Sequence, residues 1–182
     1  MTNPLNIVPE PTSKSYLAGL VLLTCTAVVG LLLDLWTKHL SVAHFAPWDD
    51  MYRFIPGYIH FTAVANHGAV FGIGQGWRWV FVAVSLAAVG FVLYMFHNSP
   101  RRWWHDLALG MLLAGILGNL YDRVFIGHVR DMIHVFPRWP NLFPWVFNIA
   151  DSLLCVSIGI LLLAGIFTSQ PRQKHEPTAK QP

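Results

Sequence analysis

The stretch Y-L-A-G-L-V-L-L-T-C-T-A-V-V-G-L-L-L, residues 16–33, decides the class of fold, because its 18 residues carry no charge. A helix of about 20 apolar residues spans the hydrocarbon core of a bilayer. Lys14 precedes the run, as a basic residue precedes a signal-peptide core, but no small-x-small cleavage site follows it. The next residues are D-L-W-T-K, 34–38. We therefore expect a retained transmembrane helix.

Three further apolar runs follow. Residues 79–96 form a second run without charge, the third covers about 103–121, and the fourth covers about 147–167 with Asp151 as its one charged residue. Tryptophans stand at the edges of these runs, as an aromatic belt at a membrane interface predicts: Trp36, Trp77, Trp79, Trp103, Trp104 and Trp145. We expect an all-α polytopic membrane protein with four transmembrane helices.

The composition agrees with a membrane protein. Charged residues make up 12% of the 182 residues, hydrophobic residues 54%, and the mean hydropathy is +0.47. These values exclude a disordered chain and disfavour a soluble domain. The net charge of +3 is not gathered into a basic stripe, so we expect membrane lipids rather than nucleic acid as partners. Cys25 and Cys155 lie inside apolar runs and indicate no disulfide.

The chain divides into a polar N-terminal extension (1–15), a membrane domain (16–167) and a polar C-terminal tail (168–182). Within the domain, segment 34–78 has two β-prone stretches around Pro56-Gly57, which predict a small hairpin or sheet. Segment 122–146, interrupted by prolines, is a second extramembrane piece on the same side. Four spans place both termini on one side. Six Lys and Arg on each side leave the orientation undecided, and only the Arg101-Arg102 pair favours cytoplasmic termini.

Polar residues gather at the ends of the predicted spans, where a charge is costly and therefore a functional candidate. Asp34 and Lys38 have the i,i+4 spacing of an ion pair, which also suits a plain helix terminus. The other candidates are Asn66, Gly68 and Ala69 in N-H-G-A-V-F-G, Asn119, Asp122 and Arg123 in G-N-L-Y-D-R, Asp131 in H-V-R-D-M-I, and Asn148 and Asp151 in F-N-I-A-D-S. A turn, a buried structural network or a solvated loop acid would explain some of them equally well. Asp151, followed by 16 uncharged residues, favours function most.

Asp131 and Asp151 suggest a reaction. If the 122–146 segment folds back over the fourth span, the two carboxyls converge, share one proton and can activate water as in an aspartic protease. Such chemistry needs no metal or cofactor. Nine histidines are present, but none has zinc-ligand spacing. A proton- or ion-coupled transporter and a non-enzymatic assembly factor remain alternatives.

The ordered set D-L-W-T-K, N-H-G-A-V-F, G-N-L-Y-D-R, V-R-D-M and F-N-I-A-D-S closely resembles the lipoprotein signal peptidase (signal peptidase II) family. The resemblance covers about residues 16–167. It implies a bacterial inner-membrane aspartyl peptidase with four transmembrane helices, a periplasmic β-cradle and a short periplasmic helix. Both termini would be cytoplasmic, with the active site at the periplasmic face. Its substrates would be prolipoproteins whose cysteine carries diacylglycerol, cleaved before that cysteine, and globomycin would inhibit it.

Under this resemblance the catalytic pair is Asp131 and Asp151. The supporting or substrate-binding residues are Asp34, Lys38, Asn66, Gly68, Ala69, Asn119, Asp122, Arg123 and Asn148. We expect a monomer without a cofactor. The chain departs from the family at Met132, where phenylalanine is usual, at Ala114-Gly115 in place of a glycine pair, and at His67. These departures leave every polar position filled.

Overall fold

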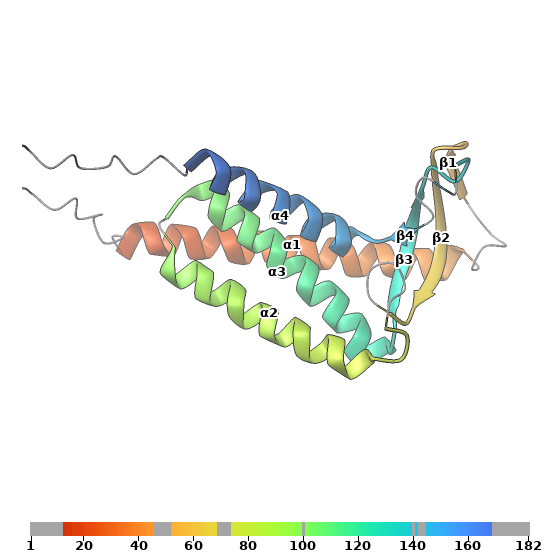
Figure 1. Cartoon of the computed structure of the whole chain (residues 1–182), viewed down its shortest axis with the longest axis horizontal. Helices are drawn as coiled ribbons and strands as arrows, with labels where there is room; N and C mark the ends of the chain where they lie inside the picture. Colours follow the sequence, from red (N-terminus) through yellow and green to blue (C-terminus); the bar gives the residue numbers. More distant parts are fainter. Residues whose placement is uncertain are drawn as a thin grey trace, which may run out of the picture.

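A bundle of four helices carries a small sheet across one end (Figure 1). The computed structural model describes residues 13–45, 52–68, 74–99, 101–139, 141 and 145–168. For residues 166–168 it describes the backbone only. The helices are α1 (Ser13–His44), α2 (Arg78–Asn98), α3 (Trp103–Tyr121) and α4 (Ile149–Thr168). The described chain begins and ends at the end of the bundle opposite the sheet (Figure 1).

Within the described part of the chain, three stretches are long and apolar enough to cross a membrane: Ser13–His44, Arg78–Asn98 and Trp103–Ile126. In α4 the apolar part, Ile149–Gly165, is shorter. The outer faces of α1 and α2 expose large apolar side chains, for example Val29, Leu32 and Trp79. In water such surfaces would be unfavourable, whereas acyl chains solvate them.

Helix α3 lies at the centre and packs against α1, α2 and α4. Its glycines permit close approach. A Cβ atom on Gly110 would lie 2.8 Å from the carbonyl oxygen of Leu23, and one on Gly115 would lie 2.6 Å from that of Ala150. Small residues at helix contacts are the usual way in which membrane helices come close together. The central position of α3 brings its C-terminal end between α1 and the start of α4.

The sheet has four antiparallel strands in the order β1-β2-β3-β4: Tyr52–Ile55, Ile59–Asn66, Val129–Val135 and Val146–Phe147. The predicted hairpin around Pro56-Gly57 is present as β1 and β2, and Gly57 has the positive φ (81°) that favours glycine. Strand β3 pairs with β2 so that Asp131 lies opposite Val64 and Val129 lies opposite Asn66. Two segments far apart in sequence therefore meet at one sheet.

The structure corrects two details of the sequence interpretation and adds a third. Helix α1 does not end near Leu33 but continues to His44, because the charges of Asp34 and Lys38 are paired and buried. Segment 122–146 contributes the inner strand β3 rather than only irregular chain. The end of α3 continues as a π-helical turn, Asp122–Ile126. The short periplasmic helix stays a prediction: the described residues of 34–78 contain no separate short helix, and 46–51 and 69–73 lie outside the description.

Candidate active site

The first turn of α4 is closed by a reciprocal pair of side chains. Oδ1 of Asn148 accepts the backbone N–H of Asp151 at 2.9 Å, and Oδ2 of Asp151 accepts the backbone N–H of Asn148 at 3.2 Å. This N-x-x-D arrangement is a capping box, which satisfies amide groups that have no partner inside the helix. The cap also fixes the Asp151 carboxylate at the helix N-terminus, where the helix dipole favours negative charge.

Strand β3 brings Asp131 to the same place. Its Oδ1 accepts Nδ2 of Asn148 at 2.6 Å, and its Oδ2 accepts Nδ2 of Asn66 at 3.0 Å. The Asn148 side chain and backbone therefore bridge the two carboxyl groups directly. The sequence separates these acids by 20 positions, and the fold joins them through one asparagine.

Asn119, near the end of α3, is the second amide that connects the site. Its Nδ2 donates to Oδ1 of Asp151 at 2.8 Å, while its Oδ1 accepts Nζ of Lys38 at 2.9 Å and Nδ2 of Asn148 at 3.2 Å. With both ends of the amide occupied, its orientation is determined. Asn119 thus links the carboxyl groups to a charged network behind them.

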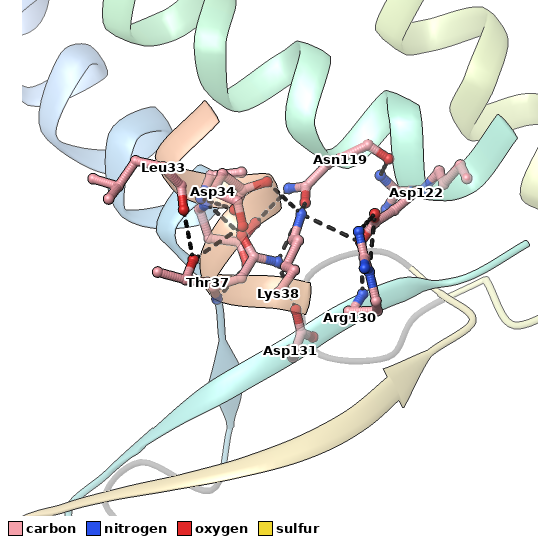
Figure 2. Close-up of polar contacts among 12 residues, drawn as sticks. Leu33, Asp34, Thr37, Lys38, Asn119, Asp122, Arg130 and Asp131 are labelled. Carbon is pink, nitrogen blue, oxygen red and sulfur yellow. Dashed lines mark hydrogen bonds and ion pairs between the residues drawn. The ribbon is translucent and has the colours of Figure 1, made fainter. Parts of the chain in front are cut away.

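That network is centred on Lys38, which is fully buried (Figure 2). Its Nζ lies 2.7 Å from Oδ2 of Asp34 and 3.4 Å from Oδ2 of Asp122, and both carboxylates are also fully buried. Oδ1 of Asp34 accepts the backbone N–H of Ala150 at 2.8 Å. Asp34 therefore ties α1 to the first turn of α4, close to Asp151. Buried charges of this kind require such pairing, because desolvation is costly.

Arg123 reaches across the site from the π-helical turn. Its guanidinium donates to the carbonyl oxygens of Gly68 (3.1 Å) and Asn119 (3.3 Å) and lies 5.2 Å from the ring centroid of Phe81. The backbone N–H of Gly68 in turn donates to Oδ1 of Asn66 at 3.0 Å. The turn after β2 is thereby held against α3.

The electrostatic environment of Asp131 is unusual. Burial raises the pKa of its carboxyl from 3.8 to about 7, and the negative charge of Asp151 acts in the same direction. Hydrogen bonds from Asn66 and Asn148 and the charge of Lys38 oppose this shift without cancelling it. At neutral pH a substantial fraction of Asp131 therefore retains its proton.

Ten of the eleven predicted site residues form one connected set of hydrogen bonds and ion pairs. The set consists of Asp34, Lys38, Asn66, Gly68, Asn119, Asp122, Arg123, Asp131, Asn148 and Asp151. The eleventh, Ala69, lies outside the described residues. The sequence analysis missed Arg130, which pairs with Asp122 at 2.6 Å. Its position next to Asp131, in a chain with few charges, was the available signal.

Chemically, the arrangement places two carboxyl groups with different hydrogen-bond partners in one cluster of neutral amides. Within the described part of the chain, no group of three or more His, Cys, Asp or Glu side chains is placed to hold a metal ion.

Comparisons with known proteins agree with this architecture. The model of the family described as "Signal peptidase (SPase) II" matches residues 26–167. Lipoprotein signal peptidases of Halalkalibacterium halodurans and Microcystis aeruginosa are 36% and 40% identical, covering 82% and 76% of this chain and 95% and 87% of theirs. A solved structure described as a bacterial membrane enzyme superposes with a TM-score of 0.73 at 27% identity, covering 88% of this chain and 94% of that one.

Apolar helices, a small sheet and this structural likeness define a multi-pass membrane protein. The chain belongs to the signal peptidase II (lipoprotein signal peptidase) family. Membership implies a peptidase that removes signal peptides from prolipoproteins.

Proposed function

We propose that the chain is an aspartic endopeptidase of the bacterial inner membrane. It cleaves diacylglyceryl-modified prolipoproteins immediately before the lipidated cysteine, and Asp131 and Asp151 are its catalytic pair. The observation that carries the proposal is the bridge through Asn148, which holds one carboxyl from β3 and one from α4 in the same polar cluster.

The two acids have different roles. Asp131, whose pKa is raised to about 7, holds the proton and donates it to the oxygen of the scissile carbonyl. Asp151, at the N-terminus of α4, accepts a proton from water as the water oxygen bonds to the carbonyl carbon. When the resulting gem-diol collapses, the carbon–nitrogen bond breaks and the leaving nitrogen takes the proton held by Asp151. A hydroxyl proton of the gem-diol returns to Asp131, so both carboxyls regain their starting states.

The remaining residues position the pair. Asn66, Asn119 and Asn148 orient the carboxylate oxygens through the hydrogen bonds described above. The Asn66 and Gly68 region and Arg123 also supply polar groups for the substrate backbone. Ala69 is assigned to the same substrate-binding turn on the resemblance alone. Preorganised amide and guanidinium groups lower a barrier more than mobile ones, because little reorganisation accompanies the reaction.

The membrane explains how this substrate meets the site. We propose four spans, with α4 as the fourth, both termini cytoplasmic and the sheet in the periplasm. The exposed apolar faces of α1 and α2 support contact with lipid acyl chains. A diacylated substrate then keeps its lipid in the bilayer while its scissile bond lies near the interface, where water is available. We propose that the enzyme acts as a monomer.

The test is cleavage in detergent by the purified protein, with product masses read by mass spectrometry. The substrate is a prolipoprotein carrying diacylglycerol on its cysteine, and the matched control is the same polypeptide without the lipid. We expect one cut, directly before the lipidated cysteine, inhibition by globomycin, and little or no cleavage of the control. A cut elsewhere, or equal cleavage of both polypeptides, contradicts the proposed specificity.

A further inference from the structure

Resting on the proposed function, we infer that Arg130 is a positioning residue for the pair. It fixes Asp122, and through Asp122 and Lys38 it determines how Asn119 and Asn148 hold Asp131 and Asp151. The Arg130 guanidinium and backbone N–H donate to Asp122 and not to either carboxyl of the pair. Its role is therefore indirect and distinct from that of the neighbouring Asp131.

Arg130 holds Asp122 by a side-on fork. Its Nη2 lies 2.6 Å from Oδ1 of Asp122, its Nε lies 3.2 Å from both carboxylate oxygens, and its backbone N–H donates to Oδ2 at 2.9 Å. Asp122 is fully buried, and the Arg130 side chain is 13% exposed. A planar guanidinium matches a carboxylate in this way, whereas a lysine offers only a point charge.

Charge balance behind the pair depends on this fork. The buried network contains two carboxylates, Asp34 and Asp122, and two cations, Lys38 and Arg130. Because Arg130 neutralises Asp122, Lys38 can remain close to Asp34 (2.7 Å) and Asn119 (2.9 Å), with Asp122 more distant at 3.4 Å. Without Arg130 one cation would serve two buried carboxylates. Lys38 would then be drawn towards Asp122 and away from Asn119.

A shift of Lys38 reaches the pair through one amide. Asn119 accepts from Lys38 at Oδ1 and donates to Asp151 at Nδ2, and the same Oδ1 accepts from Asn148, which binds Asp131. The charged groups around Asp131 come from each neighbouring element: Asp151 of α4, Lys38 of α1, Asp122 and Arg123 of the π-helical turn, and Arg130 of β3. Removing one positive charge from this set favours the protonated form of Asp131.

The experiment compares Arg130→Lys and Arg130→Met with Arg53→Met as the matched control. Arg53 lies on exposed strand β1 of the same sheet, so its loss changes the net charge equally without touching the network. Rates are measured against pH on diacylglyceryl-prolipoprotein in detergent, with melting temperatures in parallel. For Arg130→Met we expect kcat to fall about 10- to 100-fold with KM within about twofold, because small misplacements of reacting groups are costly. We also expect the limb of the pH–rate profile assigned to Asp131 to move to higher pH, partial rescue in Arg130→Lys, and no change in Arg53→Met.

Wild-type kcat and an unshifted pH limb in folded Arg130→Met would overturn the inference. So would a loss of kcat that follows the melting temperature alone, or full activity in Arg130→Lys. If Arg130→Met does not fold, the lysine variant decides by its pH limb. Asp131→Asn separates this inference from the proposed function: if that variant is inactive while Arg130→Met is normal, only the role of Arg130 fails. If Asp131→Asn is fully active, the catalytic pair itself fails.

Discussion

The two ends of α3 both hold a buried acid with an arginine, yet only one resembles an active site. At the sheet end Asp122 is fully buried against Arg130, and at the far end Asp106 is 2% exposed and lies 3.5 Å from Arg101. Burial of charge therefore does not distinguish them. At the sheet end, neutral amides connect the ion pairs to two further carboxyls. Convergent amides, rather than buried charges alone, distinguish the end that we propose as the active site.

At the far end, Arg101 and Asp106 connect the turn between α2 and α3 to α1. The Arg101 guanidinium donates to the backbone carbonyls of Phe96 and Ser99 and lies 4.1 Å from the Phe96 ring centroid. A Cβ atom on Gly19 of α1 would lie 2.6 Å from Oδ2 of Asp106. These contacts hold the turn between α2 and α3 against α1. Among the described residues, nothing at this end orients a second carboxyl.

Replacing one cation at each end gives the largest expected effects on stability and sharpens the comparison. Lys38→Met leaves two buried carboxylates with one cation, so we expect a loss of about 3 to 5 kcal/mol in unfolding free energy and loss of cleavage. Arg101→Met removes a looser pair and backbone hydrogen bonds, so we expect about 1 to 3 kcal/mol with kcat retained. Denaturant unfolding in detergent and cleavage assays on the folded fractions measure both. Equal losses of kcat in the two variants would erase the distinction between the ends.

A smaller effect is expected from the cap of α4. Asn148→Ala removes an N-cap, costing about 1 kcal/mol, and it also removes the bridge between the carboxyls, so kcat should fall by about 10-fold or more. Asn98→Ala, at the exposed C-terminal end of α2 where Nδ2 donates to the Tyr94 carbonyl, is the matched amide control and should keep kcat. The assignment of Asn148 is wrong if its variant loses stability but keeps wild-type kcat.

The last prediction is the pH dependence set by Asp131. Because its pKa is raised from 3.8 to about 7, the folded state binds this proton more tightly than the unfolded state does. Its contribution to stability is therefore complete below about pH 4 and is lost as the pH rises through about 7. The kcat should also fall as the pH rises above about 7, by about tenfold per pH unit. Asp106→Asn should preserve the pH dependence of both stability and kcat. Asp131→Asn should abolish this contribution to the pH dependence of stability. A wild-type kcat that is flat from pH 6 to 9 would refute this role of Asp131.

Sequence reasoning predicted the members of the polar cluster more fully than it predicted the scaffold. The i,i+4 spacing of Asp34 and Lys38 predicted that they form an ion pair. The spacing in G-N-L-Y-D-R predicted that Asn119 and Arg123 share a helical face. The end of α1 was misplaced because charges in an apolar run indicate an interface unless their partners are known. Those partners, Asn119 and Asp122, lie 81 and 84 positions further along the chain.

Strand β3 was missed for a similar reason. In V-R-D-M-I-H-V, the Arg130-Asp131 pair interrupts the apolar pattern of a strand, and nearby prolines suggest a loop. The structure shows that these polar residues belong to the network, so the strand's irregular pattern reflects the site. Arg130 was overlooked with it. The π-helical turn at Asp122–Ile126 likewise depends on contacts that no local pattern contains.

The most direct test of the central claim is cleavage of diacylglyceryl-prolipoprotein by wild type, Asp131→Asn, Asp151→Asn and the double variant, with Asp106→Asn as control. Asp106 is as buried as Asp131 (2% and 3% exposed) and lies at the other end of the bundle. We predict that each single variant of the pair loses at least about a hundredfold in kcat and that the double variant is no worse, because the two acids act as a unit. The control should cleave within a few-fold of wild type. Folded Asp131→Asn or Asp151→Asn with wild-type kcat would contradict the account.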